Sequence, residues 1–137
     1  MRALLQLAIN HRTILLAAGL LGATGVAFGA FGALALRDFL LERGMTVAWD
    51  TAARYQLLHA VALFVAAAWL RSASGTVSRR LSWAATCWCV GTVLFSGSLY
   101  GLAAGGPHWL GPVTPLGGLA LMAGWLCVVA AALAKES

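Results

Sequence analysis

Residues 13–36 read TILLAAGLLGATGVAFGAFGALAL, a run without a single charged side chain. An α-helix rises about 1.5 Å per residue, so about 20 apolar residues cross a hydrocarbon core about 30 Å thick. The run does not alternate in hydrophobicity as a strand of a membrane β-barrel would. It also exceeds the apolar stretch of about 7–15 residues that is typical of a signal peptide. We therefore expect a retained transmembrane helix.

Three further apolar segments of similar length lie at about 51–70, 81–104 and 116–134. Of the 137 residues, 61% are hydrophobic and 9% are charged, whereas about 25% of an average soluble domain is charged. A chain of this length cannot bury so much apolar surface in a core of its own. These features predict an all-α integral membrane protein, a single domain in which four transmembrane helices form one bundle in the lipid bilayer.

The connections between the predicted helices differ in character. Residues 37–50 are mixed and amphipathic, which predicts a short interfacial segment with Trp49 at the level of the lipid headgroups. Residues 71–80 form a polar, basic loop. Residues 105–115 contain all three prolines, which predicts a turn-rich loop.

Positive charge is distributed unevenly between the two sides of the predicted bundle. The side with both termini and the 71–80 loop carries six cations: Arg2, Arg12, Arg71, Arg79, Arg80 and Lys135. The other side carries charges of both signs: Arg37, Asp38, Glu42, Arg43 and Asp50. The excess of cations predicts that both termini face the cytoplasm, in a bacterial inner membrane. The net charge of +5 thus indicates topology, and we expect no nucleic-acid partner.

Small residues recur on one side of three predicted helices, where helices can approach closely in lipid. We expect packing inside the bundle at eight glycines: Gly22, Gly25, Gly29, Gly32, Gly97, Gly101, Gly117 and Gly124. Leucine at position 97 or 101 is then expected to force two backbones apart. The alternative is that one of these stripes forms a dimer interface.

Polar residues interrupt the apolar pattern at one depth of the membrane. The candidate polar site consists of Tyr55, Gln56, His59, Ser96, Ser98, Tyr100 and Thr114. A polar group without a partner in hydrocarbon costs several kcal/mol, so the first three should face the bundle interior. We expect His59 to bond a group of the third helix or of the 105–115 loop, with Ser96 and Tyr100 as the best partners. Two interpretations stay open: a network that only joins helices, and a small ligand site.

No pattern in the sequence indicates catalysis, a metal or a cofactor. Cys87 and Cys89 are two residues apart, so on a helix they face nearly opposite sides and cannot bind one metal ion together. The stretch GSLYG at 97–101 is not the G-x-S-x-G nucleophile motif. The acidic residues all lie at segment ends, so no carboxylate inside the membrane can relay protons. We therefore expect a non-enzymatic protein without a cofactor.

Several stretches together resemble one family of small membrane proteins. They are FGAFGA at 28–33, WDTAARYQLLHAVAL at 49–63, LFSGSLY at 94–100, GPVTPLGG at 111–118 and GW at 124–125. In this order they resemble the bacterial YgdD-like family, which is similar to the eukaryotic transmembrane protein 256. The resemblance covers nearly the whole chain.

The resemblance implies a four-helix integral membrane protein of uncertain biochemical role. The family pattern falls on Tyr55, Gln56, His59, Ser96, Gly97, Ser98, Tyr100, Thr114, Pro115, Gly117 and Gly118. Family members often have a histidine after GAFGA, where this chain has Leu34, so a mechanism that needs two membrane histidines is in doubt. We expect a bundle that supports or binds another membrane protein, or a second copy of itself. The alternative is binding or passage of a lipid, quinone or small solute at the polar site.

Overall fold

The computed structural model of the chain describes residues 9–135, and within that range it contains helices and no strand. Four helices are long and apolar enough to cross a membrane, and a short helix follows the first of them. In chain order they are α2 (His11–Ala33), α3 (Arg37–Glu42), α4 (Thr46–Leu70), α5 (Gly75–Ala103) and α6 (Leu110–Ala132). The predicted fold class, an all-α membrane protein with four transmembrane helices, is confirmed.

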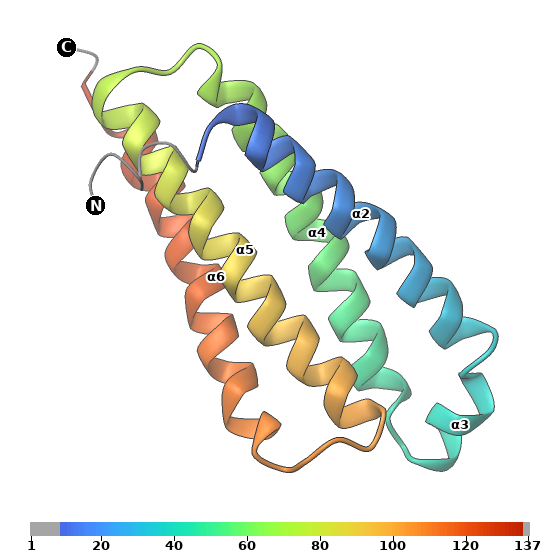
Figure 1. Cartoon of the computed structure of the whole chain (residues 1–137). Helices are drawn as coiled ribbons and strands as arrows, with labels where there is room; N and C mark the ends of the chain where they lie inside the picture. The colour runs from blue at the N-terminus through green and yellow to red at the C-terminus, as the bar shows by residue number, and fades with distance from the viewer. Residues whose placement is uncertain (1–8, 136–137) are drawn as a thin grey trace.

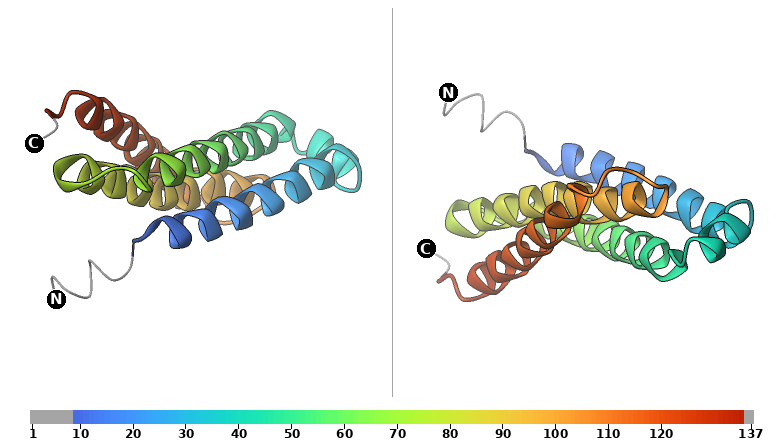
Figure 2. Two further views of the ribbon diagram at one scale, coloured as in Figure 1. Left: turned by 90° about the horizontal axis from the view of Figure 1, so that it is seen from above. Right: turned by 90° about the horizontal axis from the view of Figure 1, so that it is seen from below.

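The four long helices form an open bundle around a central pair. α4 packs on α5, α2 packs on the side of α4, and α6 packs on α5. Figures 1 and 2 show α2 and α6 as the two outer helices, with no comparable contact between them. Both outer helices therefore leave most of their surface free to face lipid. The first described residues and the end of α6 lie at the same end of the bundle as the α4–α5 connection (Figure 1).

α6 packs closely on α5 because three positions at the contact lack a side chain. Gly117 lies directly against the backbone of Phe95, and Gly124 lies against the ring of Trp88. A Cβ on Gly91 would stand 2.9 Å from the backbone nitrogen of Leu121. Contacts between backbones of this kind are the usual basis of helix association in lipid.

On the other side of the bundle, glycines also allow α2 to pack closely on α4. A Cβ on Gly25 would stand 2.9 Å from Leu57, and Gly32 lies directly against the indole of Trp49. At Gly22 and Gly29 an added Cβ would be in ordinary contact, 3.9 Å from an alanine Cβ of α4. These four of the five glycines of α2 therefore face α4.

Two glycines of α5 do not hold helices together as the sequence predicts. Gly97 is exposed, and nothing lies within 4 Å of the place where its Cβ would be. The prediction for Gly97→Leu is therefore wrong, because this residue lies on the lipid-facing side of α5. A Cβ on Gly101 would stand 2.7 Å from the side-chain end of Leu110, just after the α5–α6 turn. The side chain of Leu110 can move aside, so a larger residue at position 101 would be tolerated.

Several helices begin earlier than hydropathy predicts. α5 begins at Gly75 with a polar first turn, and α4 begins at Thr46, so both helices start before their predicted apolar segments. α6 begins at Leu110 and contains Pro115, so the predicted 105–115 loop is shorter. Proline near the start of a helix removes few backbone hydrogen bonds, and membrane helices tolerate it.

The segment 37–50 also differs from its prediction. Its first part forms α3, and residues 46–50 belong to α4. Trp49 is only 7% exposed and lies inside the bundle, packed with Leu40 and Ala103 at the α3 end. The reason is the space beside Gly32, which admits the indole ring, and a carbonyl of α2 that accepts its N–H.

Two arginine side chains form hydrogen bonds to carbonyls at the ends of neighbouring helices. The Nε of Arg43, between α3 and α4, donates to the carbonyl of Ala103 at 3.2 Å. At the opposite end, Nη1 of Arg80 donates to the carbonyl of Ala130. The last carbonyls of a helix have no hydrogen-bond donor within that helix. Arg43 supplies a donor to the end of α5, and Arg80 of α5 supplies a donor to the end of α6.

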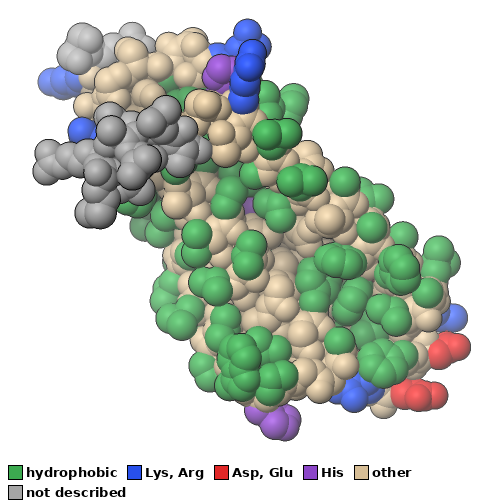
Figure 3. All heavy atoms as spheres, in the orientation of Figure 1, with side chains coloured by type: hydrophobic (Ala, Val, Ile, Leu, Met, Phe, Trp, Pro, Cys, Tyr) green, Lys and Arg blue, Asp and Glu red, His purple; other side chains and the backbone are tan. Residues whose placement is uncertain are grey.

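Apolar side chains cover the length of the molecule, as Figure 3 shows for one face. Within the described residues, the acidic side chains are at the end that carries α3: Asp38, Glu42 and Asp50. The charged groups thus lie at the two ends of the helices, where the headgroups and water are.

Candidate functional site

Gln56 is the centre of the predicted polar site and is 4% exposed. Its Nε2 donates to the carbonyl of Leu21 at 3.0 Å and to the hydroxyl oxygen of Thr24 at 2.8 Å, both on α2. Its Oε1 accepts a hydrogen bond of 2.9 Å from the hydroxyl of Tyr100 on α5. One amide therefore joins three helices, and both ends of that amide are paired.

An aromatic cluster packs beside this amide, nearer the α3 end of the bundle. The indole N–H of Trp49 donates to the carbonyl of Phe28 at 2.7 Å. The ring of Tyr100 lies between the two, with its centroid 4.7 Å from that of Trp49 and 4.9 Å from that of Phe28. The cluster thus fixes the position from which the Tyr100 hydroxyl reaches Gln56.

His59 is also 4% exposed but belongs to a different contact. Its Nε2 accepts a hydrogen bond of 3.2 Å from the indole N–H of Trp125 on α6. Its Nδ1 lies 2.8 Å from the carbonyl of Tyr55, which can only accept. The proton is therefore on Nδ1, and the imidazole is neutral with both nitrogens paired.

The predicted partner of His59 was wrong. It is not on the third helix or in the 105–115 loop, because Gly117 and Gly124 let α6 approach α5 so closely that Trp125 reaches α4. The rings of Trp88 and Trp125 each lie 6.1 Å from the imidazole, centroid to centroid. His59 is thus enclosed by aromatic rings.

Tyr55 does not face the interior as predicted, since 41% of its surface is exposed. It precedes Gln56 by one residue and is therefore turned by about 100° around the helix. Its ring packs against Phe95, with centroids 4.8 Å apart, and stacks beside His59. Tyr55 covers the network from the lipid side.

Ser96 and Ser98 join α5 to its two neighbours, α4 and α6. The hydroxyl of Ser96 donates to the carbonyl of Ala52 on α4 at 2.8 Å. The hydroxyls of Ser98 and Thr114 share a hydrogen bond of 2.7 Å between α5 and α6. The seven predicted residues therefore lie at several contacts, not around one cavity.

Sequence reasoning missed four residues of these contacts: Thr24, Trp49, Trp88 and Trp125. A spacing could have indicated Trp49, since it precedes Gln56 by seven residues and so lies on the same side of the helix. The residues with a buried, unpaired side-chain atom in the described range are not among the predicted seven; they are Thr46, Trp88 and Thr92.

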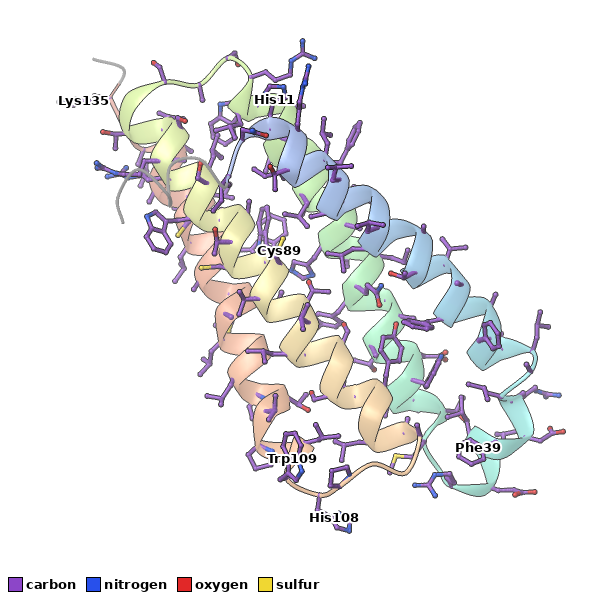
Figure 4. The ribbon with its side chains drawn as sticks, viewed as in Figure 1. His11, Phe39, Cys89, His108, Trp109 and Lys135 are labelled. Carbon is purple, nitrogen blue, oxygen red and sulfur yellow. The ribbon has the colours of Figure 1, made fainter. Side chains whose placement is uncertain are left out.

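Metal binding finds no support in the described part of the chain. Across residues 9–135, no three side chains of His, Cys, Asp or Glu lie close enough to hold a metal ion. Figure 4 shows that Cys89 and His108 lie far apart along the bundle.

A family model described as "Protein of unknown function (DUF423)" matches residues 28–118. A UPF0382 membrane protein of Staphylococcus epidermidis is 42% identical over 108 residues, which are 79% of this chain and 84% of the relative. The UPF0382 membrane protein YwdK of Bacillus subtilis is 40% identical over 107 residues, or 78% and 85% of the two chains.

A third relative covers more of the chain. The UPF0382 inner membrane protein YgdD of Escherichia coli K12 is 35% identical over 130 residues, or 91% of this chain and 92% of the relative. No solved structure matches the chain. The predicted resemblance to YgdD is confirmed. The chain belongs to the DUF423 family, and like these relatives it is a membrane protein.

Proposed function

We propose that this protein is a non-enzymatic bundle of the bacterial inner membrane that binds or supports another membrane protein. The observation that carries the proposal is the pairing inside the polar network. Gln56 uses both ends of its amide, and His59 uses both ring nitrogens. Groups that are already paired within the protein have little left to offer a ligand, which favours a structural role for them.

The pairing also weakens the alternative, a lipid, quinone or solute site among these residues. A ligand there would have to break hydrogen bonds between helices, and each unpaired group would then cost free energy in hydrocarbon. The surface toward lipid is the place where a partner can bind without that cost.

The outer side of α2 is the surface we propose for the partner. Gly19, Ala23 and Ala27 are exposed, follow one another at steps of four and lie on one side of the helix. Nothing lies within 4 Å of the position of a Cβ on Gly19. Among the long helices, α2 packs mainly on α4, so a transmembrane helix of a partner can approach this row closely.

Photo-crosslinking in cells tests this proposal. A photo-reactive amino acid at Ala23 should give a discrete product with one membrane protein, because the partner helix lies against this row. The same group at Leu119, which is 61% exposed on α6, is the matched control and should give no such product. Gly19→Leu should abolish the product without lowering the free energy of unfolding by more than about 0.5 kcal/mol. Equal products from both positions would contradict the proposal.

The orientation that we propose places both termini in the cytoplasm. The end with the α4–α5 connection carries Arg12, Arg71, Arg79, Arg80 and Lys135, and no acidic residue in the described range. Arg2, which entered the prediction, lies outside the described residues. The charge difference supports the orientation through the positive-inside rule, and the name of the relative YgdD supports the inner membrane.

Cysteine labelling tests the orientation in a variant without its three native cysteines. Ser74→Cys should stay unlabelled by a membrane-impermeant maleimide on intact cells, because the residue is exposed at the cytoplasmic end. His108→Cys, exposed at the opposite end, should react at once. Both should react after the cells are opened. Labelling of Ser74→Cys in intact cells would reverse the proposed topology.

A further inference from the structure

An apolar groove of about 240 Å³ lies between α4 and α6 in the half of the bundle that holds the termini. Leu58, Val61 and Val65 of α4 form one wall, and Trp125 and Val128 of α6 form the other. Its lining is almost wholly apolar, and Trp69 lies at the end of the groove nearest the α4–α5 connection. The groove exists because α4 and α6 both pack on α5 and diverge from each other (Figure 2).

A second, polar cavity of about 320 Å³ adjoins the groove at Trp69, which lines both. Its other polar side chains are Ser72, Ser74, Thr76 and Lys135. Figure 4 shows Lys135 at the end of the bundle beside the α4–α5 connection. An apolar groove and a hydroxyl-lined cavity with a cation therefore lie on the two sides of Trp69.

The dimensions of the groove fit one acyl chain. From Leu58 to Trp69 α4 rises by about 16 Å, which is close to the thickness of one leaflet of the hydrocarbon core, about 15 Å.

The positive charges at this end of the bundle favour an anionic lipid headgroup. Lys135 lines the polar cavity, and the same end carries Arg71, Arg79 and Arg80 without an acidic side chain in the described range. Hydroxyl groups and a lysine are suited to a phosphate, and basic pockets between transmembrane helices bind anionic headgroups. A zwitterionic headgroup would add a cation to a surface that is already positive.

We propose that this groove and the cavity beside it bind one anionic glycerophospholipid of the leaflet at the end with the α4–α5 connection. One acyl chain lies between α4 and α6, and the phosphate lies near Lys135. Trp69 covers the junction, as tryptophan does at the boundary between headgroups and hydrocarbon. The site is at the end of the bundle away from Tyr100, and it does not depend on the partner proposed for α2.

Native mass spectrometry of the purified full-length protein tests the site. The probes are phosphatidylglycerol and phosphatidylcholine with identical acyl chains, each titrated from detergent micelles. We expect phosphatidylglycerol to bind about fivefold more tightly, since one headgroup charge near a lysine contributes about 1 kcal/mol. Lys135→Gln should remove most of that preference. Glycerol phosphate, which has the headgroup chemistry without the chains, should not compete.

A second pair of variants tests the groove separately from the headgroup. Val61→Trp narrows the groove and should weaken the binding of both lipids at least severalfold. Phe64→Trp is the matched control and should leave the binding of both lipids unchanged. Phe64 is 60% exposed on α4 but does not line the groove. Both sites are exposed, so both variants should fold, which circular dichroism checks. The proposal is overturned if the wild type binds both lipids equally, or if Lys135→Gln and Val61→Trp both bind like the wild type.

Discussion

Gly117→Leu is expected to separate α5 from α6 and to lower the free energy of unfolding by about 3 kcal/mol or more. The glycine lies directly against the backbone of Phe95, and a backbone cannot turn aside as a side chain can. Overpacking usually costs about 1–3 kcal/mol. Here the added atoms would also separate the helices along the contact and so weaken the hydrogen bond between Ser98 and Thr114.

Gly97→Leu is the matched control for that experiment, because Gly97 is an open position on α5. Leucine favours a helix over glycine by up to about 1 kcal/mol, so this variant should be as stable as the wild type or slightly more stable. Unfolding in detergent, followed by circular dichroism, compares the two. Equal stability of both variants would show that α5 and α6 are not held at Gly117.

Gln56→Leu is expected to lower the free energy of unfolding by about 2 kcal/mol. The change keeps a side chain of similar size but removes three hydrogen bonds to α2 and α5. Hydrogen bonds between membrane helices contribute about 0.6 kcal/mol on average, and the hydroxyl of Tyr100 would also lose its partner.

The control for Gln56→Leu is Tyr55→Phe, the neighbouring residue on the same helix. Tyr55 is 41% exposed, so removal of its hydroxyl should change the free energy of unfolding by less than about 0.5 kcal/mol. Titration with a denaturing detergent measures both variants against the wild type. A loss as large for Tyr55→Phe as for Gln56→Leu would contradict the account of the network.

The sequence predicts the number of membrane helices well because hydropathy reports directly on contact with lipid. It predicts their ends less well, since the helical turns that begin at Thr46, Gly75 and Leu110 all precede the predicted apolar segments. A helix continues beyond the hydrocarbon core wherever its backbone hydrogen bonds can form. Hydropathy therefore marks the part of a helix that lies in lipid and not the residue at which it begins.

The polar residues could be found from the sequence, but their partners could not. Polarity inside an apolar run identifies Gln56 and His59, because such groups need a partner in hydrocarbon. Which partner they meet depends on how the helices are rotated and how closely they approach. Trp125 reaches His59 only because α6 lies so close to α5 at Gly124, a contact that spacing within one helix does not reveal.

The central claim is that the buried polar groups join helices to one another, and a double-mutant cycle between Gln56→Leu and Tyr100→Phe tests it most directly. The four proteins are unfolded by the same detergent titration, so that the coupling free energy isolates the 2.9 Å hydrogen bond between the two side chains. We predict a coupling of about 0.6–1.7 kcal/mol in favour of the intact pair. Effects that add to within about 0.3 kcal/mol would contradict the claim.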